Sequence, residues 1–498
     1  MKIILLIAFS WLLVCAGIRP AQAVDLGLFS THQDIGSPSH AGSAVYDPAA
    51  GTYLVSGGGG NLWAKTDSFQ FVCKEMSGDL SFSASAHWLK PGGNPHRKAF
   101  LIIRQSMDPD SPYVDVAQHG VGLAALQFRE TKAAITQEIQ SGFSGPVRIG
   151  LQKRGDYVSF WISNHGEELH PAGGSFKLPF SEPFYVGLGV CAHDDSTVEQ
   201  AEFSRVELKA LPPLPVDAKG EVQSTLETMP VASTDRMILF HTNANIQAPN
   251  WTKDNHLIFN GGGKLYRIAI TNDAIPENIP LPELRNINND HGISPDGSQL
   301  AISAGGPSRI FVGPITGGAF KLITPTGPSY FHGWSPDGRT LAFCGQRSGE
   351  FDVYTIPAEG GDEKRLTTAP GLDDGPEYSP DGQYIYFNSE RSGLMQIWRM
   401  KADGTEQTQM TPNDDHNNWF AHLSPDGRKL VFLAFDNQVK ANDHPANKDV
   451  ALRLMPAGGG PITTLAKFFG GQGTINVASW SPDSKSIAFV TYTTIYPQ

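Results

Sequence analysis

Short runs of alternating apolar and polar residues fill the second half of the chain. Runs such as "TLAFC", "YIYFN" and "KLVFL" have the length of single strands, and Gly, Pro, Asp and Asn separate them. A period of two between turn-forming residues is typical of β-strands. The pattern therefore predicts an all-β structure here.

One turn recurs along this half at nearly constant spacing. Ser-Pro-Asp turns begin at Ser294, Ser335, Ser379, Ser424 and Ser481, at intervals of 41, 44, 45 and 57 residues. "NWTKDNHLIF" supplies a degenerate sixth copy, with Thr252 in place of the serine. Four strands in a unit of about 40–45 residues match a β-propeller blade. We expect a six-bladed β-propeller over residues 233–498.

The last repeat is short of its outer strands, whereas strand-like segments precede the first complete repeat. "LPPLPVDAKG" is a stiff, proline-rich stretch, and "STLETMPV" follows it. We expect residues 213–232 to form a linker and a strand that pairs with the last repeat. Such pairing removes open sheet edges.

The first half of the chain carries the same alternation without the repeat. Runs such as "LSFSASAHWL" and "VRIGLQKRGDYVSFWIS" predict one all-β domain over residues 24–212. Residues 1–23 combine Lys2, an apolar run and a small-residue cleavage signal, which is typical of a secretory signal peptide. We therefore expect a periplasmic or secreted protein. No later stretch reaches the roughly 18 apolar residues that span a bilayer, so no integral membrane segment is expected.

The composition of the chain limits the kinds of partner that we expect it to bind. The chain has 498 residues, a formal net charge of −12 and 40% hydrophobic residues. Nucleic acid is not an expected partner, because binding it depends on Lys and Arg that neutralise phosphates.

Three cysteines follow the signal sequence, namely Cys73, Cys191 and Cys344. Cys73 and Cys191 either pair with each other or are isolated core thiols.

The repeat resembles a known family. "SPDGRTLAFCGQRSGEFDVYTI" is similar to the TolB-type propeller repeat, which the Tol-Pal propeller, prolyl-oligopeptidase-like enzymes and oligogalacturonate lyases share. No G-x-S-x-G motif follows the repeats, so the peptidase activity lacks its nucleophile. The N-terminal domain resembles a concanavalin- or laminin-G-like jelly roll, with "LIIRQSMDPDSPYVDV" as its most recognisable segment.

Histidines and a carboxylate recur just before the turns. His291 and His332 lie three residues before their serines, and Glu377 and His422 lie two before theirs. This strand lines the channel of a propeller, so the side chains are expected near one axis. Imidazole and carboxylate groups suit a transition metal, and His332 and Glu377 suit acid–base catalysis. Alternatively, each side chain satisfies a buried backbone group.

The resemblance to oligogalacturonate lyases implies a histidine-rich metal site that assists β-elimination from a uronic acid. The resemblance carries over the type of site and no exact ligand set. From their positions before the turns, His291, His332 and His422 are candidate ligands for a divalent Mn, Fe, Zn or Ca ion. Arg347 and Arg391 are candidates to neutralise the substrate carboxylate. Their alternative role is to hold each blade together, as Arg-Ser-Gly does in TolB-like repeats.

Four more residues are candidates for substrate binding. Asn418 and Trp419 lie in "DDHNNWFAH", and Gln472 and Asn476 lie in the Gly-rich "FGGQGTIN". Three functions remain open at this point. The protein is an enzyme acting on an acidic oligosaccharide, with the jelly roll as a glycan-binding module. Alternatively, it is a scaffold that binds a cell-envelope protein, or a module that captures a glycan without cleaving it.

Overall fold

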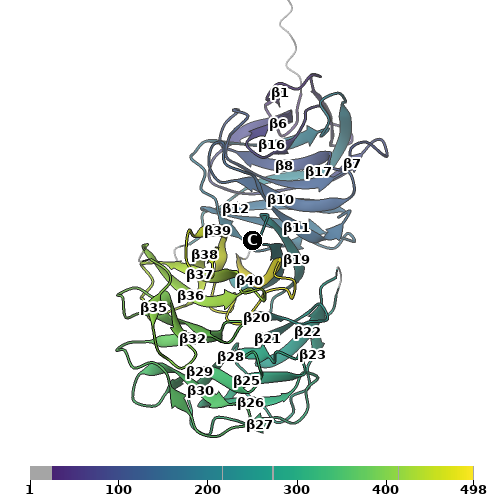
Figure 1. The fold of residues 1–498 in the computed structure, drawn as a ribbon. Coiled ribbons are helices and arrows are strands. Elements are labelled where there is room, and N and C mark those ends of the chain that lie inside the picture. Colours follow the sequence, from purple (N-terminus) through teal and green to yellow (C-terminus); the bar gives the residue numbers. More distant parts are fainter. Residues whose placement is uncertain (1–24, 216, 272–273, 413, 497–498) are drawn as a thin grey trace, which may run out of the picture.

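The protein forms two β lobes along one axis (Figure 1). The computed structural model describes residues 25–215, 217–271, 274–412 and 414–496. Every named element in these ranges is a β-strand, as the alternation in the sequence predicts. The predicted signal peptide lies outside the described residues. No helix in the described part of the chain has the length and apolar character to cross a bilayer.

Two sheets build the N-terminal lobe. One sheet has the order β1 (Thr31–Ile35), β6 (Phe69–Met76), β16 (Phe184–Cys191), β8 (Lys98–Arg104), β9 (Tyr113–His119), β10 (Leu123–Arg129) and β11 (Gln137–Ser144). The other has the order β14 (His170–Pro171), β13 (Tyr157–Ser163), β12 (Arg148–Arg154), β7 (Asp79–Trp88), β17 (Glu199–Leu211), β3 (Thr52–Gly57) and β2 (Ser43–Asp47), and β15 (Phe176–Lys177) pairs with β13. The hairpin β4 (Leu62–Trp63) and β5 (Thr66–Asp67) is separate.

A shared apolar core holds these two sheets together. Val114 and Val116 of β9 belong to the same buried cluster as Phe82 of β7 and Phe160 of β13. Asp115 lies between the two valines and faces the opposite side of its sheet, because side chains alternate along a strand. The lobe is thus a β-sandwich. Its closer resemblance to a jelly roll stays a prediction.

The second lobe contains five four-stranded sheets, each with its strands in sequence order and its first strand at one edge. The first two are β20 (Ile246–Trp251), β21 (His256–Gly261), β22 (Lys264–Ala269), β23 (Glu277–Asn278), and β24 (His291–Ile293), β25 (Gln299–Gly305), β26 (Ser308–Pro314), β27 (Lys321–Leu322). The third and fourth are β28 (Ser329–Trp334), β29 (Thr340–Gln346), β30 (Phe351–Pro357), β31 (Lys364–Arg365), and β32 (Asp373–Tyr378), β33 (Tyr384–Ser389), β34 (Gln396–Lys401), β35 (Thr408–Gln409). The fifth is β36 (His416–Leu423), β37 (Lys429–Asp436), β38 (Ala446–Pro456) and β39 (Thr463–Gly471).

The six separate blades expected from the sequence do not form, because the strands of the last repeat join the sandwich. β40 (Ser486–Ile495) pairs with β18 (Glu221–Pro230), which pairs with β19 (Asp235–Thr242). β19 then pairs in parallel with β11 of the N-terminal lobe. These strands therefore end a ten-stranded sheet that runs through both lobes, and five blades remain as sheets of their own.

The Ser-Pro-Asp turns explain why the repeat is so regular. In each turn the serine hydroxyl donates to the aspartate carboxylate two residues later, over 2.5 to 2.7 Å. The same hydroxyl accepts a backbone N–H at the start of the next strand, as in Gln299 N to Ser294 Oγ at 2.9 Å. Thr252 donates to Asp254 at 2.6 Å in the degenerate copy. Each turn thus fixes the register between the first two strands of a blade.

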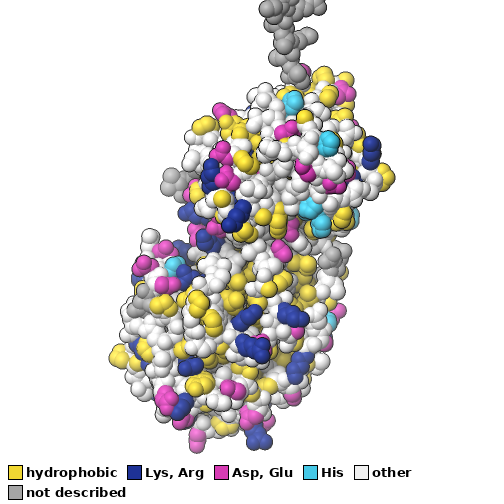
Figure 2. Space-filling model, turned by 45° about the horizontal axis from the view of Figure 1, so that its top comes forward, with side chains coloured by type: hydrophobic (Ala, Val, Ile, Leu, Met, Phe, Trp, Pro, Cys, Tyr) yellow, Lys and Arg dark blue, Asp and Glu magenta, His cyan; other side chains and the backbone are white. Residues whose placement is uncertain are grey.

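Contacts beyond the shared sheet hold the two lobes against each other. The Tyr157 hydroxyl donates to the Asp449 carboxylate at 2.8 Å, and Lys467 Nζ lies 3.0 Å from Glu130 Oε2. The backbone N–H of Ser175 donates to Thr493 Oγ1 at 2.8 Å. Acidic and basic side chains gather where the lobes meet (Figure 2). The three cysteines are buried free thiols, so Cys73 and Cys191 do not pair.

Candidate functional site

A cavity of about 540 Å³ lies where the first strands of several blades converge. Its walls come from the segment before β24, from β28, β32 and β36, and from the loop between β39 and β40. We call it the channel cavity. Its ionisable and aromatic lining residues are Asp290, His332, Asp374, His444, Tyr330, Phe351 and Phe420; its amides are Asn288, Asn289, Asn442, Gln472 and Asn476.

An ion pair between two blades marks the centre of the lining. His332 Nε2 of β28 lies 3.1 Å from Asp374 Oδ1 of β32, and both side chains are mostly buried. Burial by itself lowers the pKa of His332, but the Asp374 carboxylate outweighs it and raises that pKa above its usual value. Burial raises the pKa of Asp374, yet His332 outweighs it and holds that pKa well below its usual range. Each partner thus favours the charged form of the other.

Asp290 adds a second carboxylate to this wall. It is 7% exposed, and burial raises its pKa to about 6. Nearby His332 lowers the pKa of Asp290 less than burial raises it. The lining thus combines two carboxylates, Asp290 and Asp374, with the imidazoles of His332 and His444, and no Lys or Arg is among the residues that line it.

Cys344 also lines the channel cavity, but its chemistry is passive. Its Sγ lies 3.5 Å from the backbone oxygen of Asp373, to which the thiol donates. Burial raises the pKa of this thiol well above its ordinary value. The thiolate is the reactive form of cysteine, so this side chain acts as a buried apolar group.

Three of the residues singled out in the sequence line the cavity, namely His332, Gln472 and Asn476. Asn476 Nδ2 donates to Gln472 Oε1 at 3.0 Å, and Asn476 Oδ1 accepts the Gly473 N–H at 2.6 Å. These bonds fix the glycine-rich loop against the channel. The amide groups are therefore held in place as part of the wall.

Glu377 and His422 form a contact between repeats outside the lining of the channel cavity. His422 Nδ1 lies 2.6 Å from Glu377 Oε2, and the other ring nitrogen bonds the backbone oxygen of Ile475. Glu377 Oε1 also accepts the Leu423 N–H at 3.0 Å. The pair joins the fourth and fifth blades to the last repeat, which is the structural alternative weighed for these residues.

His291 is also separate from the channel cavity. It lies on β24, is 1% exposed, and burial lowers its pKa to about 4. The imidazoles of His291, His332 and His422 thus do not meet. Among the described residues, no group of three or more His, Cys, Asp or Glu side chains is placed to hold a metal ion.

Arg347 and Arg391 each hold their own blade together. Arg347 forms an ion pair with Glu363 at 2.7 Å and donates to Ser329 Oγ at 2.7 Å. Arg391 donates to both carboxylate oxygens of Asp373, at 2.8 and 2.9 Å. Neither guanidinium lines the channel cavity, so their placement matches the structural alternative.

Asn418 and Trp419 lie inside the fifth blade. Both are 0% exposed, and Trp419 belongs to an apolar core cluster. Asn418 Nδ2 donates to Gln396 Oε1 at 2.8 Å. A saccharide has no access to either side chain in this arrangement.

Sequence reasoning missed Asp290, Asp374, Tyr330, Phe420 and His444. β-Bulges in β28, β32 and β36 are the reason for Tyr330, Asp374 and Phe420, because each bulge adds one residue to an inner strand and reverses the face that side chains beyond it point to. Asp290 precedes β24, whose pairing has no register shift, and His444 lies in the loop between β37 and β38, so bulges do not explain these two. Register shifts lie between Phe331 and Gly333 in β28, and between Asp374 and Glu377 in β32. A fixed offset from the serine therefore does not select channel-facing side chains. The Asp-Gly pair at 374–375 was the sequence signal available for the bulge in β32. Gly375 has a φ of 61° there.

The repeated blades define the class first: this is a β-propeller protein. The family model of the TolB beta propeller domain, PD40, matches residues 292–458. The uncharacterized protein Atu1656 of Agrobacterium fabrum is 44% identical over 277 residues, which are 55% of this chain and 94% of that protein. The chain belongs to the family of TolB-like β-propeller proteins.

A solved structure agrees with this assignment. A TolB-like structure from Agrobacterium tumefaciens is 43% identical, with a TM-score of 0.53, over 56% of this chain and all of that chain. An oligogalacturonate lyase in complex with manganese is 13% identical, with a TM-score of 0.34, over 50% of this chain and 75% of that chain. A similarity of that size supports no argument about chemistry.

Proposed function

We propose that this protein is a non-catalytic propeller scaffold of the periplasm that binds a protein partner at the channel cavity. The observation that carries the proposal is the composition of the lining, in which the carboxylates of Asp290 and Asp374 occur with the imidazoles of His332 and His444 and with no Lys or Arg. Polar amides and the rings of Tyr330, Phe351 and Phe420 surround these charges. Such a lining suits a primary ammonium group, which gains from both carboxylates and aromatic faces.

A lysine side chain or a free N-terminus is the chemistry that fits. An extended segment places one such group in a cavity of this size without a large rearrangement. The cavity is built on strands held by the Ser-Pro-Asp turns, so little order has to be created on binding. The signal-like residues 1–23 support placement of the protein in the periplasm, where a cell-envelope protein is the available partner.

Cleavage of an acidic oligosaccharide is the second candidate, and it has less support. A uronate needs a cation beside its carboxylate, but no Lys or Arg lines the cavity and His332 is already paired with Asp374. Arg347 and Arg391 are engaged within their blades. A divalent metal remains the one route to this chemistry, and no group of three or more His, Cys, Asp or Glu side chains in the described part of the chain is placed to hold one.

Elemental analysis of the purified protein separates the two functions. The lyase requires about one equivalent of Mn, Fe, Zn or Ca in the wild type and its loss in His332→Ala. The scaffold requires no difference in metal content between these proteins.

Site-specific photo-cross-linking tests the scaffold directly. Phe351→p-benzoylphenylalanine puts a reactive group in the lining of the channel cavity. Leu322→p-benzoylphenylalanine is the matched control, because Leu322 is 39% exposed on β27 at an outer edge of the propeller. We expect a discrete protein adduct in the native cell envelope from position 351, absent from position 322.

Charge dependence completes this test. The adduct from position 351 should weaken at least ten-fold when Asp374→Asn is added, and it should persist with Asp362→Asn, a change of the same charge at an exposed site. Equal adducts from both cross-linking positions, or an adduct indifferent to Asp374, contradict the proposal.

A further inference from the structure

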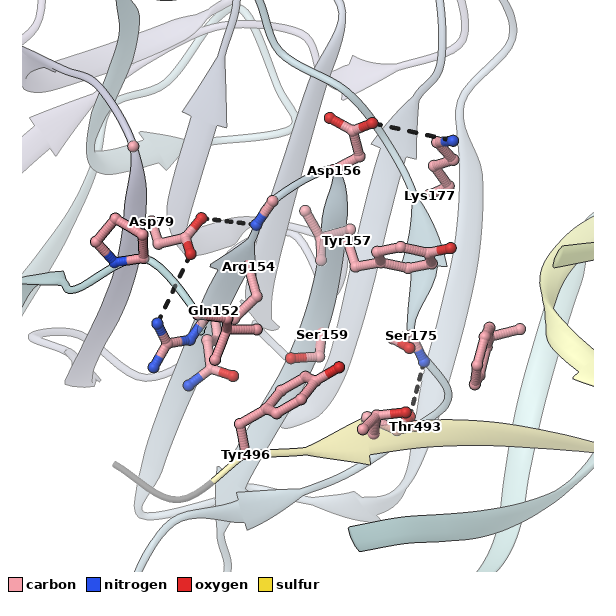
Figure 3. A pocket seen from close by; sticks show the side chains of 17 residues that line it. Asp79, Gln152, Arg154, Asp156, Tyr157, Ser159, Ser175, Lys177, Thr493 and Tyr496 are labelled. Carbon is pink, nitrogen blue, oxygen red and sulfur yellow. Dashed lines mark hydrogen bonds and ion pairs between the residues drawn. The ribbon is translucent and has the colours of Figure 1, made fainter. Parts of the chain in front are cut away.

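A second cavity, of about 690 Å³, lies between the two lobes and away from the propeller channel (Figure 3). We call it the interdomain cleft. The sandwich contributes β12, β13 and β15, and the propeller side contributes Phe469 of β39 and the end of β40 with Tyr496. Ligand cavities are common at such domain junctions, and this volume is within their usual range.

Aromatic rings line the cleft from both lobes. Tyr157 extends from the sandwich and Tyr496 follows the last strand, and Figure 3 shows the Tyr157 ring above Ser159 and the Tyr496 ring below it. The Tyr157 and Phe469 rings meet edge to face, with centroids 6.0 Å apart. Flat apolar faces beside hydroxyl groups suit a ligand that is apolar on one face and polar at its rim.

Polar groups with spare hydrogen-bonding capacity stand beside these rings. Arg154 is 9% exposed; its Nη1 donates to the Pro212 backbone oxygen at 2.7 Å, whereas its Nε is buried without a partner among the described residues. The side-chain amide of Gln152, on the same strand, also makes no hydrogen bond within the described part of the chain. Gln152 is half-buried, so its amide is the group of the two that a ligand in the cleft can reach.

The charges of the cleft cancel in pairs. Arg154 Nη1 lies 3.7 Å from Asp79 Oδ2, and Lys177 Nζ lies 3.9 Å from Asp156 Oδ2. A ligand of either charge meets a local opposite group but no net excess. The lining therefore favours an uncharged ligand rich in hydroxyl groups.

The cleft is also formed before any ligand arrives. The Tyr157 hydroxyl is bound by Asp449, and Thr493 bonds the Ser175 N–H on the floor of the cleft. The shared ten-stranded sheet fixes the two lobes in one arrangement. A ligand consequently has little ordering free energy to overcome.

From these observations we infer that the interdomain cleft binds a neutral saccharide unit, stacked on Tyr496 and Tyr157 and hydrogen-bonded by Gln152. This site is distinct from the channel cavity and does not rest on the function proposed for it. The inference assigns binding only, with no reaction on the sugar.

Isothermal titration with cellotriose, maltotriose, xylotriose and chitotriose, each to about 5 mM, tests the inference. We expect saturable binding of at least one of these sugars, weakened at least ten-fold by Gln152→Ala and by Tyr496→Ala. Both positions lie at the cleft surface outside the apolar cores, so both variants should fold. Tyr330→Ala, in the channel cavity, is the control and should leave the affinity unchanged.

Three outcomes overturn the inference. These are binding by none of the four sugars, an affinity that neither cleft variant changes, or an affinity that Tyr330→Ala abolishes. The last outcome moves the sugar to the channel cavity. Because the cross-linking experiment reports on protein adducts alone, the failure of either proposal leaves the other to its own test.

Discussion

The His422 ring and the Glu377 carboxylate are 2.6 Å apart in neighbouring blades, and both are mostly buried. His422 also bonds the Ile475 backbone, so one side chain connects three repeats. Loss of either partner leaves a buried polar group without its contact.

This contact predicts a stability effect without an effect on the channel cavity. His422→Ala and Glu377→Ala should each lower the free energy of unfolding by about 2–4 kcal/mol. The double variant should reveal a coupling of about 1–3 kcal/mol in a double-mutant cycle from urea unfolding. Additive losses argue against a direct contact, and loss of the position-351 adduct in a folded His422→Ala protein argues for a binding role.

Trp419 should behave as a core residue. Trp419→Ala removes a fully buried ring and should cost about 3–5 kcal/mol of stability, with a smaller loss for Trp419→Phe. Unfolding of both variants in guanidinium measures whether Trp419→Ala loses more stability than Trp419→Phe. A Trp419→Ala protein with wild-type stability and impaired sugar binding contradicts the placement of this ring in the core.

The two lobes should unfold together. Ile238 of β19 lies in the apolar core of the sandwich, and Glu227 of β18 forms a buried ion pair with Arg236 at 2.8 Å. Ile238→Ala should therefore cost about 2–5 kcal/mol and shift one common transition in differential scanning calorimetry. Two separate transitions, of which only one moves, contradict a shared sheet.

Asp290 should make stability depend on pH in a defined window. Its pKa is about 6 in the folded protein against a reference of 3.8, so the folded state holds the proton more tightly. Between about pH 4 and 6 unfolding releases a proton, and the free energy of unfolding falls as the pH rises. Above pH 6 this decrease in the free energy of unfolding is complete and amounts to about 3 kcal/mol.

Asp290→Asn removes this dependence while it preserves the shape of the side chain. The variant should be more stable than the wild type at pH 7.5 and should lose the slope between about pH 4 and 6. Urea titrations over this range measure the difference. An identical pH profile in the two proteins shows that Asp290 does not carry the buried charge.

The sequence predicted the strands and turns far better than the site. Ser-Pro-Asp spacing reports local hydrogen bonds such as Ser294 to Asp296, and local chemistry can be read from sequence. The pairing of β19 with β11 joins two segments that are far apart in the chain. The continuous sheet could therefore not be predicted from the sequence.

The offset from the turn did not predict which side chains line the channel cavity: His291, on a strand without a bulge, does not line it, whereas His332, at a bulge, does. Gln472 and Asn476 were found because a Gly-rich loop signals a close approach of the backbone. Asp374 was missed because a bulge lies between Asp374 and Glu377. The bulge changes the face of the sheet on which Asp374 lies. Arg391 was misleading because a bidentate contact suits a blade carboxylate as well as a substrate, and here Asp373 occupies it.

Titration of the protein with a lysine-rich decapeptide and with its fully acetylated counterpart tests the central claim most directly. The account predicts that the cationic peptide binds at pH 7.5 at least ten-fold more tightly than the acetylated one, and that Asp374→Asn removes this preference while Asp362→Asn keeps it. It further predicts weaker binding below pH 6, where Asp290 is protonated. Equal affinity for the two peptides, or a preference that survives Asp374→Asn, contradicts a cation-binding channel cavity.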